Sequence, residues 1–321
     1  MSRAGPLGGR RPAAELFAIR PVRRGCKSRI GGFILSGQKR VLAIHDISCL
    51  GRCSLTVALP VISAAGIETT VLPTAVLSTH TGGFTGYTFR DLTDDMRPII
   101  GHWRSLGLSF DAIYTGYLGS FRQLDIVGEI IGEFRSRSGI VIVDPVMGDN
   151  GSLYSGFTAD FPAGMAELCS QADVIVPNMT EAALMLGLSY EEGPYKVSYV
   201  EEILGRLSQL GPRQVVLKGV YFSQGEFGAA CYDAGKKAVS YFMDRKIDGI
   251  FYGTGDVFSS ALTAAAVSGL SLERAVDIAL RFTVGSIGRT ARAGTDRRLG
   301  VNFEEGLRGL IEDIRASGLD G

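Results

Sequence analysis

GIVIVDPVMGD (residues 139–149) is the stretch that decides the fold. Its first half is an uninterrupted apolar run rich in β-branched residues, which is typical of a strand buried on both faces. Asp144 ends the run, Pro145 redirects the chain, and Asp149 enters a Gly/Asn-rich turn. Strands buried on both faces belong to parallel sheets covered by helices, so this segment favours an α/β fold.

The rest of the chain repeats this alternation of apolar runs and helical segments. Strands are expected at 41–46, 67–73, 111–117, 139–145, 172–177 and 214–219, and a hairpin at 228–234 and 237–243. Helices are expected at 54–65, 93–107, 123–137, 180–186, 201–211, 255–268, 271–291 and 303–316. This order predicts a single-domain α/β/α sandwich with a mostly parallel sheet. Ligands of such sheets bind where the strands end, so residues following each apolar run are the functional candidates.

The composition is that of a globular protein. The chain has 321 residues, of which 45% are hydrophobic and 21% charged, which excludes a disordered or fibrous chain. No apolar run reaches the ~18–20 residues of a membrane span. Lys plus Arg (33) equals Asp plus Glu (33), so we expect neither a nucleic-acid nor a membrane partner.

The first forty residues differ from the rest in charge. Residues 1–40 hold ten basic residues and one acid, Glu15, so they carry +9 and the remainder −9. We expect a disordered basic extension at 1–40 and one domain at 41–321. A transit peptide, a nucleic-acid-binding arm and a start codon placed too early are the alternatives.

The cysteines indicate a reducing compartment. Five cysteines, an odd and scattered set, are typical of free thiols in the cytoplasm. Cys49 and Cys53 are four residues apart, but no second Cys/His pair follows at the spacing of a zinc site.

The segment GTGDVFSSAL (253–262) has the features of an anion site. Gly253 and Gly255 permit close backbone approach to a ligand, and the free amides of a helix start attract negative charge. Asp256 would repel a phosphate, but it is well suited to take a proton from a nucleophile attacking one. The alternative is an ordinary glycine turn with an acid that caps a helix.

Two further segments carry polar residues directly after predicted strands. Asp144 and Asp149 suit contacts to a metal or a metal-bound phosphate, and Asn178 with Glu181 suits the outer shell of hydrated Mg²⁺. Turn formation at 149–151 and a capped helix start at Asn178 are the structural alternatives. Residues 148–156 are expected to form a flap that closes over a ligand.

PTAVLSTHTGG (73–83) supplies hydroxyls and one imidazole after another predicted strand. Thr74 and His80 are therefore candidate contacts for a small polar ligand, although a lone His is more often a structural residue. The sequence contains no Walker A lysine loop, no G-x-S-x-G and no H-E-x-x-H. Once these motifs are excluded, the remaining candidate for a catalytic site is the anion site at 253–262, which contains the carboxylate of Asp256.

Five motifs together resemble those of the pyridoxal/pyridoxine/pyridoxamine kinases, vitamin kinases of the ribokinase-like superfamily. They are GTGD (253–256), DPVMGD (144–149), PNMTE (177–181), TGYLGS (115–120) and LSTHTGG (77–83). The resemblance covers about residues 41–293 and implies a ribokinase-like fold. It also implies transfer of the ATP γ-phosphate to the 5′-hydroxymethyl group of a B6 vitamer.

The resemblance implies roles for the residues of the anion site. Asp256 would be the general base, and the amides of Gly253, Thr254 and Gly255 would stabilise the transferred phosphoryl group.

It also implies residues that bind ATP and Mg²⁺. Asp144 and Glu181, with Asn178, would organise Mg²⁺ and the ATP phosphates. Asp149 would lie near the phosphates or a monovalent cation, and Lys218 would contact a phosphate.

Asp46, Thr74 and Tyr117 would contact the vitamer, with the Tyr117 ring stacked on the pyridine. Asp46 departs from the family pattern, where Ser is common, and GRCSL (51–55) replaces a Gly-Asn pair. The family is typically homodimeric. A hydroxymethylpyrimidine kinase of thiamine synthesis, a kinase acting on both substrates, and a non-catalytic vitamin-binding protein are the competing assignments.

Overall fold

A nine-stranded sheet carries the fold in this computed structural model, which describes residues 37–317. The predicted basic extension lies, up to Ser36, outside the described residues. The order across the sheet is β11-β10-β9-β8-β5-β4-β1-β2-β3. The strands are β1 (Arg40–Leu50), β2 (Glu68–Thr79), β3 (Phe89–Asp91), β4 (Phe110–Thr115), β5 (Arg135–Val143), β8 (Val174–Ile175), β9 (Gln214–Val220), β10 (Glu226–Asp233) and β11 (Ala238–Arg245).

The six central strands from β9 to β2 pair in parallel, and β3, β10 and β11 add antiparallel pairs at the two edges. The mostly parallel sheet predicted from the sequence is thereby confirmed. A separate two-stranded hairpin is formed by β6 (Gly148–Asp149) and β7 (Ser152–Leu153), inside the segment expected to be a flap.

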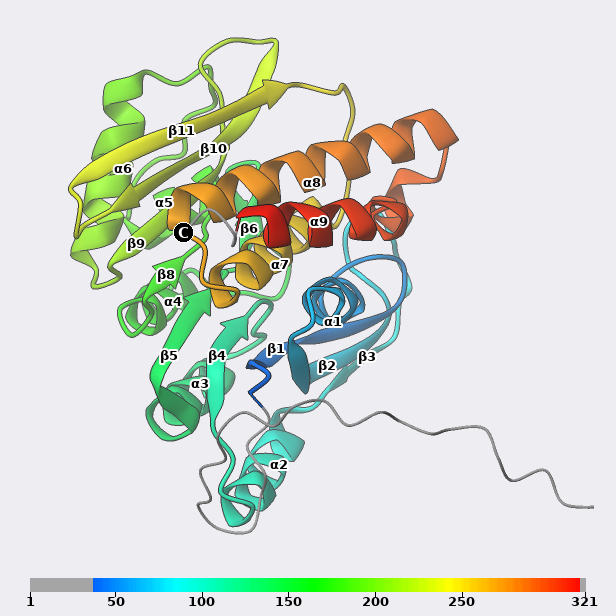
Figure 1. Ribbon diagram of the computed structural model, residues 1–321, viewed down its shortest axis with the longest axis vertical. Helices are drawn as coiled ribbons and strands as arrows, with labels where there is room; N and C mark the ends of the chain where they lie inside the picture. The colour runs from blue at the N-terminus through cyan, green and yellow to red at the C-terminus, as the bar shows by residue number, and fades with distance from the viewer. Residues whose placement is uncertain (1–36, 318–321) are drawn as a thin grey trace, which may run out of the picture. The chain divides into compact units, whose positions relative to one another are not determined.

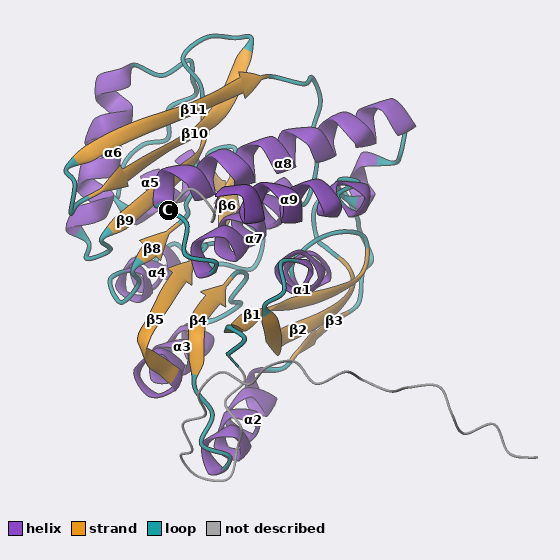
Figure 2. Ribbon diagram, in the orientation of Figure 1, coloured by secondary structure: helices purple, strands orange, loops and turns teal. Residues whose placement is uncertain are grey.

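Helices cover both faces of the sheet (Figures 1 and 2). One face is covered by α1 (Leu55–Ala64), α7 (Thr254–Val267), α8 (Leu272–Ala293) and α9 (Leu307–Ser317). The other is covered by α2 (Thr93–Ser105), α3 (Phe121–Phe134), α4 (Phe161–Cys169), α5 (Met179–Met185) and α6 (Val197–Gln209). Two short 3₁₀ turns, η1 (Arg297–Leu299) and η2 (Glu304–Gly306), precede α9.

The strands β1, β4, β5, β8 and β9 each contribute to two hydrophobic cores. In β5, Val141 and Val143 pack with α2–α6, whereas Ile142 packs with α1, α7, α8 and α9. In β4, Ile113 likewise packs with α2–α6, and Tyr114 packs with the helices of the opposite face. Successive side chains point to opposite faces, so a strand buried on both sides must be apolar throughout, as GIVIV is.

β1 and β2 are longer than the sequence indicates. β1 pairs with β4 only from Val41 to Ile44, but it continues beside β2 as far as the pair Leu50–Thr79. The register shifts between His45 and Ile47, which is an irregularity of the kind that redirects side chains. The expectations that the first strand ends at Asp46 and that Thr74 follows the second are therefore wrong, since β1 continues to Leu50 and β2 to Thr79.

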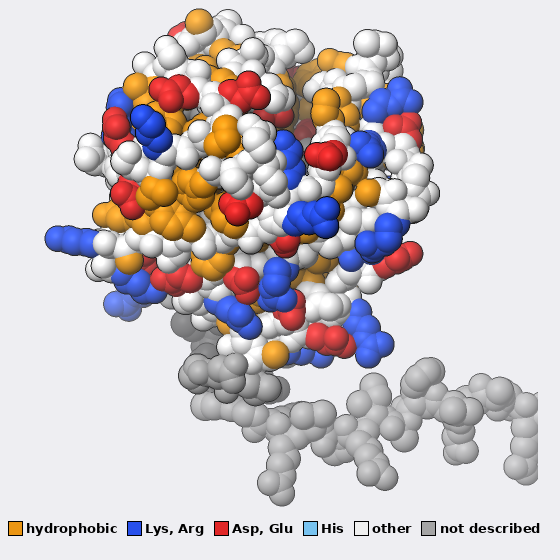
Figure 3. All heavy atoms as spheres, turned by 90° about the horizontal axis from the view of Figure 1, so that it is seen from above, with side chains coloured by type: hydrophobic (Ala, Val, Ile, Leu, Met, Phe, Trp, Pro, Cys, Tyr) orange, Lys and Arg blue, Asp and Glu red, His pale blue; other side chains and the backbone are white. Residues whose placement is uncertain are grey.

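The helix α4 has no counterpart among the expected elements. Its five buried residues have helical spacing, but the other four positions of FPAGMAELC are Ala, Gly, Ala and Glu, so its two faces differ little in polarity. None of the helices within residues 37–317 is long and apolar enough to cross a membrane. Basic and acidic side chains are interspersed on the face drawn in Figure 3.

Candidate active site

Neighbouring parallel strands bring three of the predicted polar residues together. Asp144 directly follows β5, Asn178 lies just beyond β8, and Lys218 lies in β9. Asn178 and Lys218 form an isolated parallel bridge, in which the Lys218 N–H donates to the Pro177 carbonyl at 2.8 Å. The topology thus gathers residues that are 34 and 40 positions apart at one edge of the sheet.

The start of α7 faces this edge. Gly253 is the N-cap residue with φ 71°, and a Cβ there would lie 2.0 Å from the Arg52 carbonyl oxygen, so only glycine fits. A Cβ at Gly255 would lie 3.8 Å from Lys218 Nζ, which shows that the ammonium group approaches the first turn of α7. Asp256 is the acid of that turn.

Asp144, Glu181, Asp256 and Lys218 form a group that we call the acid cluster. Lys218 Nζ lies 2.8 Å from both carboxylate oxygens of Asp144, and Ser259 Oγ donates to Asp144 Oδ2 at 2.6 Å. Asp144 is 1% exposed and the Lys218 side chain 14%. Burial alone would lower the pKa of Lys218, but the carboxylates of Asp144 and Glu181 raise it, so the lysine stays charged.

Asp256 is tuned toward proton transfer at neutral pH. Burial raises the pKa of Asp256 to about 7, with a further upward contribution from Asp144 and Asp46. The Ser54 backbone N–H and Lys218 act in the opposite direction. A carboxylate with a pKa near the working pH is well placed to act as a general base.

Glu181 and Asn178 form a capping box at the start of α5. Glu181 N–H donates to Asn178 Oδ1 at 2.8 Å, and Asn178 N–H donates to Glu181 Oε2 at 2.7 Å. The capped helix start predicted as the structural alternative is confirmed. Burial raises the pKa of Glu181 to about 8, with Lys218 acting against this shift and Asp144 adding to it.

Asp149 lies outside the buried part of the site. It is exposed, and its carboxylate accepts hydrogen bonds from the backbone and side-chain nitrogens of Asn150 at 2.9 and 3.1 Å. Asn150 (φ 49°) and Gly151 (φ 77°) form the turn expected at 149–151.

Tyr154, just after this hairpin, was not singled out from the sequence. The pKa of Tyr154 is raised by removal of its phenol from water and by the charges of Glu181, Asp149, Asp256 and Asp144, although the residue as a whole is 38% exposed. The only sequence signal for it is its position in the expected flap.

Asp46, Thr74 and Tyr117 lie together on the β1–β2 side. The Thr74 hydroxyl donates to the Tyr117 carbonyl at 3.1 Å, and the Ser48 hydroxyl donates to Asp46 Oδ2 at 3.0 Å. Burial, followed by the charge of Asp46, raises the pKa of Tyr117 to about 12. Burial also raises the pKa of Asp46, against hydrogen bonds from Ser54 and Ser48.

His80 has hydrogen-bond partners at both ring nitrogens. Nδ1 accepts from the Gly82 N–H at 3.1 Å, and Nε2 lies 2.5 Å from the Arg298 carbonyl oxygen, which assigns the proton to Nε2. The ring therefore ties the residues after β2 to η1, as expected of a structural histidine.

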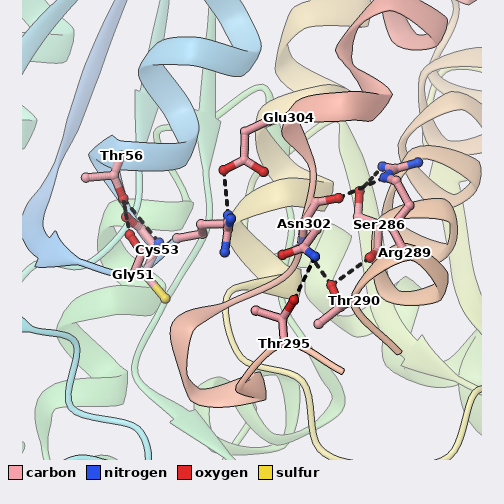
Figure 4. Close-up of polar contacts among 10 residues, drawn as sticks. Gly51, Cys53, Thr56, Ser286, Arg289, Thr290, Thr295, Asn302 and Glu304 are labelled. Carbon is pink, nitrogen blue, oxygen red and sulfur yellow. Dashed lines mark hydrogen bonds and ion pairs between the residues drawn. The ribbon is translucent and has the colours of Figure 1, made fainter. Parts of the chain in front are cut away.

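A C-terminal segment fixes the loop that follows β1, a connection that the sequence did not reveal (Figure 4). The Arg52 N–H donates to the Leu299 carbonyl at 2.9 Å, and Arg52 Nε lies 2.5 Å from Glu304 Oε1. Asn302 in turn is held to α8 by its N–H, which donates to Thr290 Oγ1 at 2.7 Å. The loop at 51–54 is thereby held against the start of α7.

The cysteines and acids offer no preformed zinc site. Cys49, Cys53, Cys169 and Cys231 are all free thiols. No group of three His, Cys, Asp or Glu side chains suited to a metal occurs in the part of the chain that the structure describes.

Comparison with known proteins gives consistent matches along most of the chain. The family model described as "Phosphomethylpyrimidine kinase" matches residues 60–300. The pyridoxine/pyridoxal/pyridoxamine kinase of Bordetella avium is 28% identical over 82% of this chain and 90% of its own length. A Bacteroides thetaiotaomicron protein assigned to phosphomethylpyrimidine kinase and crystallised with pyridoxal is 38% identical, with a TM-score of 0.81, over 85% of this chain and 96% of that one. The pyridoxal kinase of Lactobacillus plantarum is 32% identical, with a TM-score of 0.79, over 85% and 97% of the two chains.

Proposed function

Because this chain belongs to the phosphomethylpyrimidine kinase family, we propose that it is a pyridoxal kinase of vitamin B6 salvage. It transfers the γ-phosphate of ATP to the 5′-hydroxymethyl group of pyridoxal, pyridoxine or pyridoxamine. The observation that carries this proposal is Asp256, which lies in the glycine-framed first turn of α7 beside Lys218 and Asp144. A site that only bound a vitamin would have no need of a carboxylate next to an anion-binding helix start.

In this proposal Asp256 takes the proton of the hydroxymethyl group while the oxygen of that group attacks the γ-phosphorus. The bond from that phosphorus to the β–γ bridging oxygen breaks, and ADP leaves with the electron pair. The amides of Gly253, Thr254 and Gly255 donate to the transferred phosphoryl oxygens. Such donors are already oriented toward the position where negative charge forms on the phosphoryl group in the transition state. Phosphoryl transfer depends chiefly on this kind of positioning.

The acids of the described residues do not form a metal site by themselves, so a divalent cation would bind here together with the phosphates of ATP. Asp144, Glu181 and Asp256 are three acids beside one ammonium group, and the pKa values of Glu181 and Asp256 are raised by burial first and by the charge of Asp144 in addition. Oxygen donors and room for water are what Mg²⁺ requires. Asp144 and Glu181, with Asn178, would hold Mg²⁺, whose contribution when bound is to neutralise phosphate charge.

The other nucleotide contacts are assigned by position. Lys218, which is charged and close to Gly255, is proposed to contact a phosphate. Asp149, exposed on the β6–β7 hairpin, is proposed to lie near the phosphates or a monovalent cation.

The vitamer is proposed to lie over the β1–β2 side of the site. Tyr117 would stack on the pyridine ring, and Asp46 would pair with the ring nitrogen or accept from a ring substituent. Thr74 fixes the backbone of Tyr117. Both ring nitrogens of His80 are already engaged, so its contribution would be to hold the residues that follow β2 in place around the vitamer.

We also propose a cytoplasmic homodimer in which residues 41–321 form the catalytic domain and residues 1–40 an extension outside it. The four cysteines within residues 37–317 are free thiols, which agrees with a reducing compartment.

The decisive experiment is an ATP-dependent phosphorylation assay with pyridoxal, pyridoxine, pyridoxamine and hydroxymethylpyrimidine. We expect turnover of at least one B6 vitamer, and a loss of about 10²–10⁴-fold in kcat for Asp256→Asn. Asp313→Asn, which alters a surface acid of α9, is the control and should leave kcat unchanged. Wild-type rates for Asp256→Asn would remove the base assignment.

The second candidate is hydroxymethylpyrimidine kinase, which the description of the matching family favours. Turnover of the pyrimidine alone would establish it, and turnover of both substrate classes would establish a dual enzyme.

A further inference from the structure

His45 is a buried histidine that makes no hydrogen bond to any residue within 37–317. Its side chain is 0% exposed, and neither ring nitrogen has a partner in this part of the chain. Burial lowers the pKa of His45 to about 3, so the ring is neutral. A buried polar group without a partner is costly and calls for an explanation. Because the ring carries neither a charge nor a hydrogen bond to these residues, its effect on the site must come from packing.

The His45 ring packs against the end of β4. It meets the Tyr114 ring edge to face, with the two centroids 4.4 Å apart. It also lies against Gly116, the first residue beyond β4, where an added Cβ would overlap Nδ1 of His45 and lie 2.5 Å from its Cε1. Gly116 is not among the glycines with positive φ. The space taken by the His45 ring, and not the backbone conformation, therefore requires glycine at this position.

The strand β1 restrains Gly116 in two ways. The pairing of β1 with β4 ends at Ile44 and Thr115, and the Gly116 N–H donates to the Ile44 carbonyl at 3.0 Å. The next residue of β1 is His45, whose ring fills the space beside the Gly116 α-carbon. The hydrogen bond thus holds the nitrogen of Gly116, and the ring limits where its α-carbon can lie.

This restraint acts directly on Tyr117, the residue after Gly116. The Tyr117 carbonyl accepts from the Thr74 hydroxyl at 3.1 Å, and its ring centroid lies 5.7 Å from that of Phe157. A displaced Gly116 α-carbon would move the Tyr117 backbone and, with it, the ring. In a close-packed interior such a shift passes to the neighbouring residue, because few voids are available to absorb it.

We propose that His45 is a positioning residue of the vitamer site, whose ring packs against Gly116 and thereby sets the position of the Tyr117 ring. This inference rests on the proposed function, in which Tyr117 stacks on the pyridine ring of the vitamer. The proposed nucleotide contacts Asp144 and Lys218 belong to β5 and β9 and are held by their own ion pair. His45 should therefore affect the binding of the vitamer and leave the binding of ATP unchanged.

The contact is tested with Gly116→Ala, His45→Ala and the double variant. Each single change should raise KM for the vitamer about tenfold, because the added methyl overpacks the ring and the removed ring leaves Gly116 unrestrained. KM for ATP and kcat should change less than about twofold. In the double variant the methyl meets no ring, so KM should stay near tenfold and not reach the roughly hundredfold product of independent effects. A hundredfold rise in the double variant would overturn the contact.

Two further variants test whether packing is the cause. Gly132→Ala in α3 is the matched control, because no atom lies within 4 Å of the added Cβ, and it should leave both KM values unchanged. His45→Leu removes both ring nitrogens but keeps a side chain of similar volume, so KM for the vitamer should stay within about threefold of the wild type. A KM as high in His45→Leu as in His45→Ala would overturn the inference, since the ring nitrogens would then be what matters.

A measurement without substrate separates this inference from the proposed function. The full chain is produced with 3-fluorotyrosine, and Tyr117→Phe assigns the ¹⁹F resonance of Tyr117. Gly116→Ala should shift this resonance, whereas Gly132→Ala should not. Circular dichroism establishes that each variant is folded, and His45→Ala takes the place of Gly116→Ala if the latter is not. An unmoved Tyr117 resonance would overturn the inference even if the enzyme phosphorylates a vitamer, and a shifted one would support it even if no vitamer is turned over.

Discussion

Lys218 Nζ lies 2.8 Å from each carboxylate oxygen of Asp144 and joins β9 to the end of β5 at the centre of the site. Both side chains are largely removed from water. The pair holds a positive charge beside the first turn of α7, where the proposed phosphoryl transfer takes place. A buried pair of this kind is costly to break, because the remaining partner keeps an uncompensated charge.

Lys218→Met should therefore destabilise the protein by about 3–5 kcal/mol. Urea denaturation followed by fluorescence measures the loss, and the double variant Lys218→Met/Asp144→Asn should recover part of it. Arg281→Met is the matched control. It breaks an ion pair with Asp313 in which the side chains are 43% and 42% exposed, and should cost no more than about 1 kcal/mol. Equal losses for Lys218→Met and Arg281→Met would contradict a special role of the buried pair.

Stability of the ligand-free protein should fall as pH rises through the range in which Asp256 titrates. The pKa of Asp256 is raised from 3.8 to about 7, so between these values the folded state holds a proton that the unfolded state has lost. Protonation thus favours the folded state, and this contribution is lost as pH rises. Asp256→Asn should flatten the profile and, at pH 8, be more stable than the wild type by at least about 1 kcal/mol, since one pKa unit corresponds to about 1.4 kcal/mol.

Thermal unfolding from pH 5 to 8 measures this effect, and kcat/KM over the same range gives its catalytic counterpart. Because the base must be ionised, kcat/KM of the wild type should rise with pH to a plateau above about 7. A wild-type stability profile parallel to that of Asp256→Asn would contradict the raised pKa.

Gly253→Ala should lower activity by more than a loss of stability at the start of α7 would explain. The added Cβ meets the Arg52 carbonyl oxygen at 2.0 Å, so the loop at 51–54 must move. We expect a loss of about 10²-fold in kcat. Gly294→Ala is the control, because Gly294 has a similar φ of 62° but no atom within 4 Å of the added Cβ. Wild-type kcat in Gly253→Ala would show that the loop is not coupled to catalysis.

Glu181→Gln should separate the metal role of this residue from its capping role. The glutamine oxygen still accepts a backbone hydrogen bond, so α5 should form and thermal stability should change little. The Mg²⁺ concentration for half-maximal rate should rise about 10–100-fold, as for loss of an outer-shell ligand. Asn178→Ala is the comparison variant and should lower stability by about 1 kcal/mol through loss of the cap. An unchanged Mg²⁺ requirement in Glu181→Gln would remove Glu181 from the proposed metal site.

The sequence predicted most strands and helices because each leaves a local signature. GIVIV is apolar without interruption because both of its faces are buried, and SLERAVDIALRF has the spacing of an amphipathic helix. FPAGMAELC was missed because it contains Pro and Gly and because its outward positions are mostly small residues, so its two faces differ little in polarity. The extension of β1 and β2 was missed because their polar ends, SCL and LST, resemble loop residues. Their strand conformation comes from pairing with each other beyond β4.

The sequence by itself determined which chemical groups are present and where glycine is required. It placed Asp256 after two glycines, Asp144 after a buried strand, and the capping pair of Asn178 and Glu181 after the strand that follows. These depend on residues close together in the chain, whose conformational preferences are local. Only the tertiary structure decided that Lys218 pairs with Asp144 and that Glu304 holds the loop of Arg52. These partners come from strands and helices far apart in sequence. Their charges interact strongly because folding removes water from around them, and no local pattern records that.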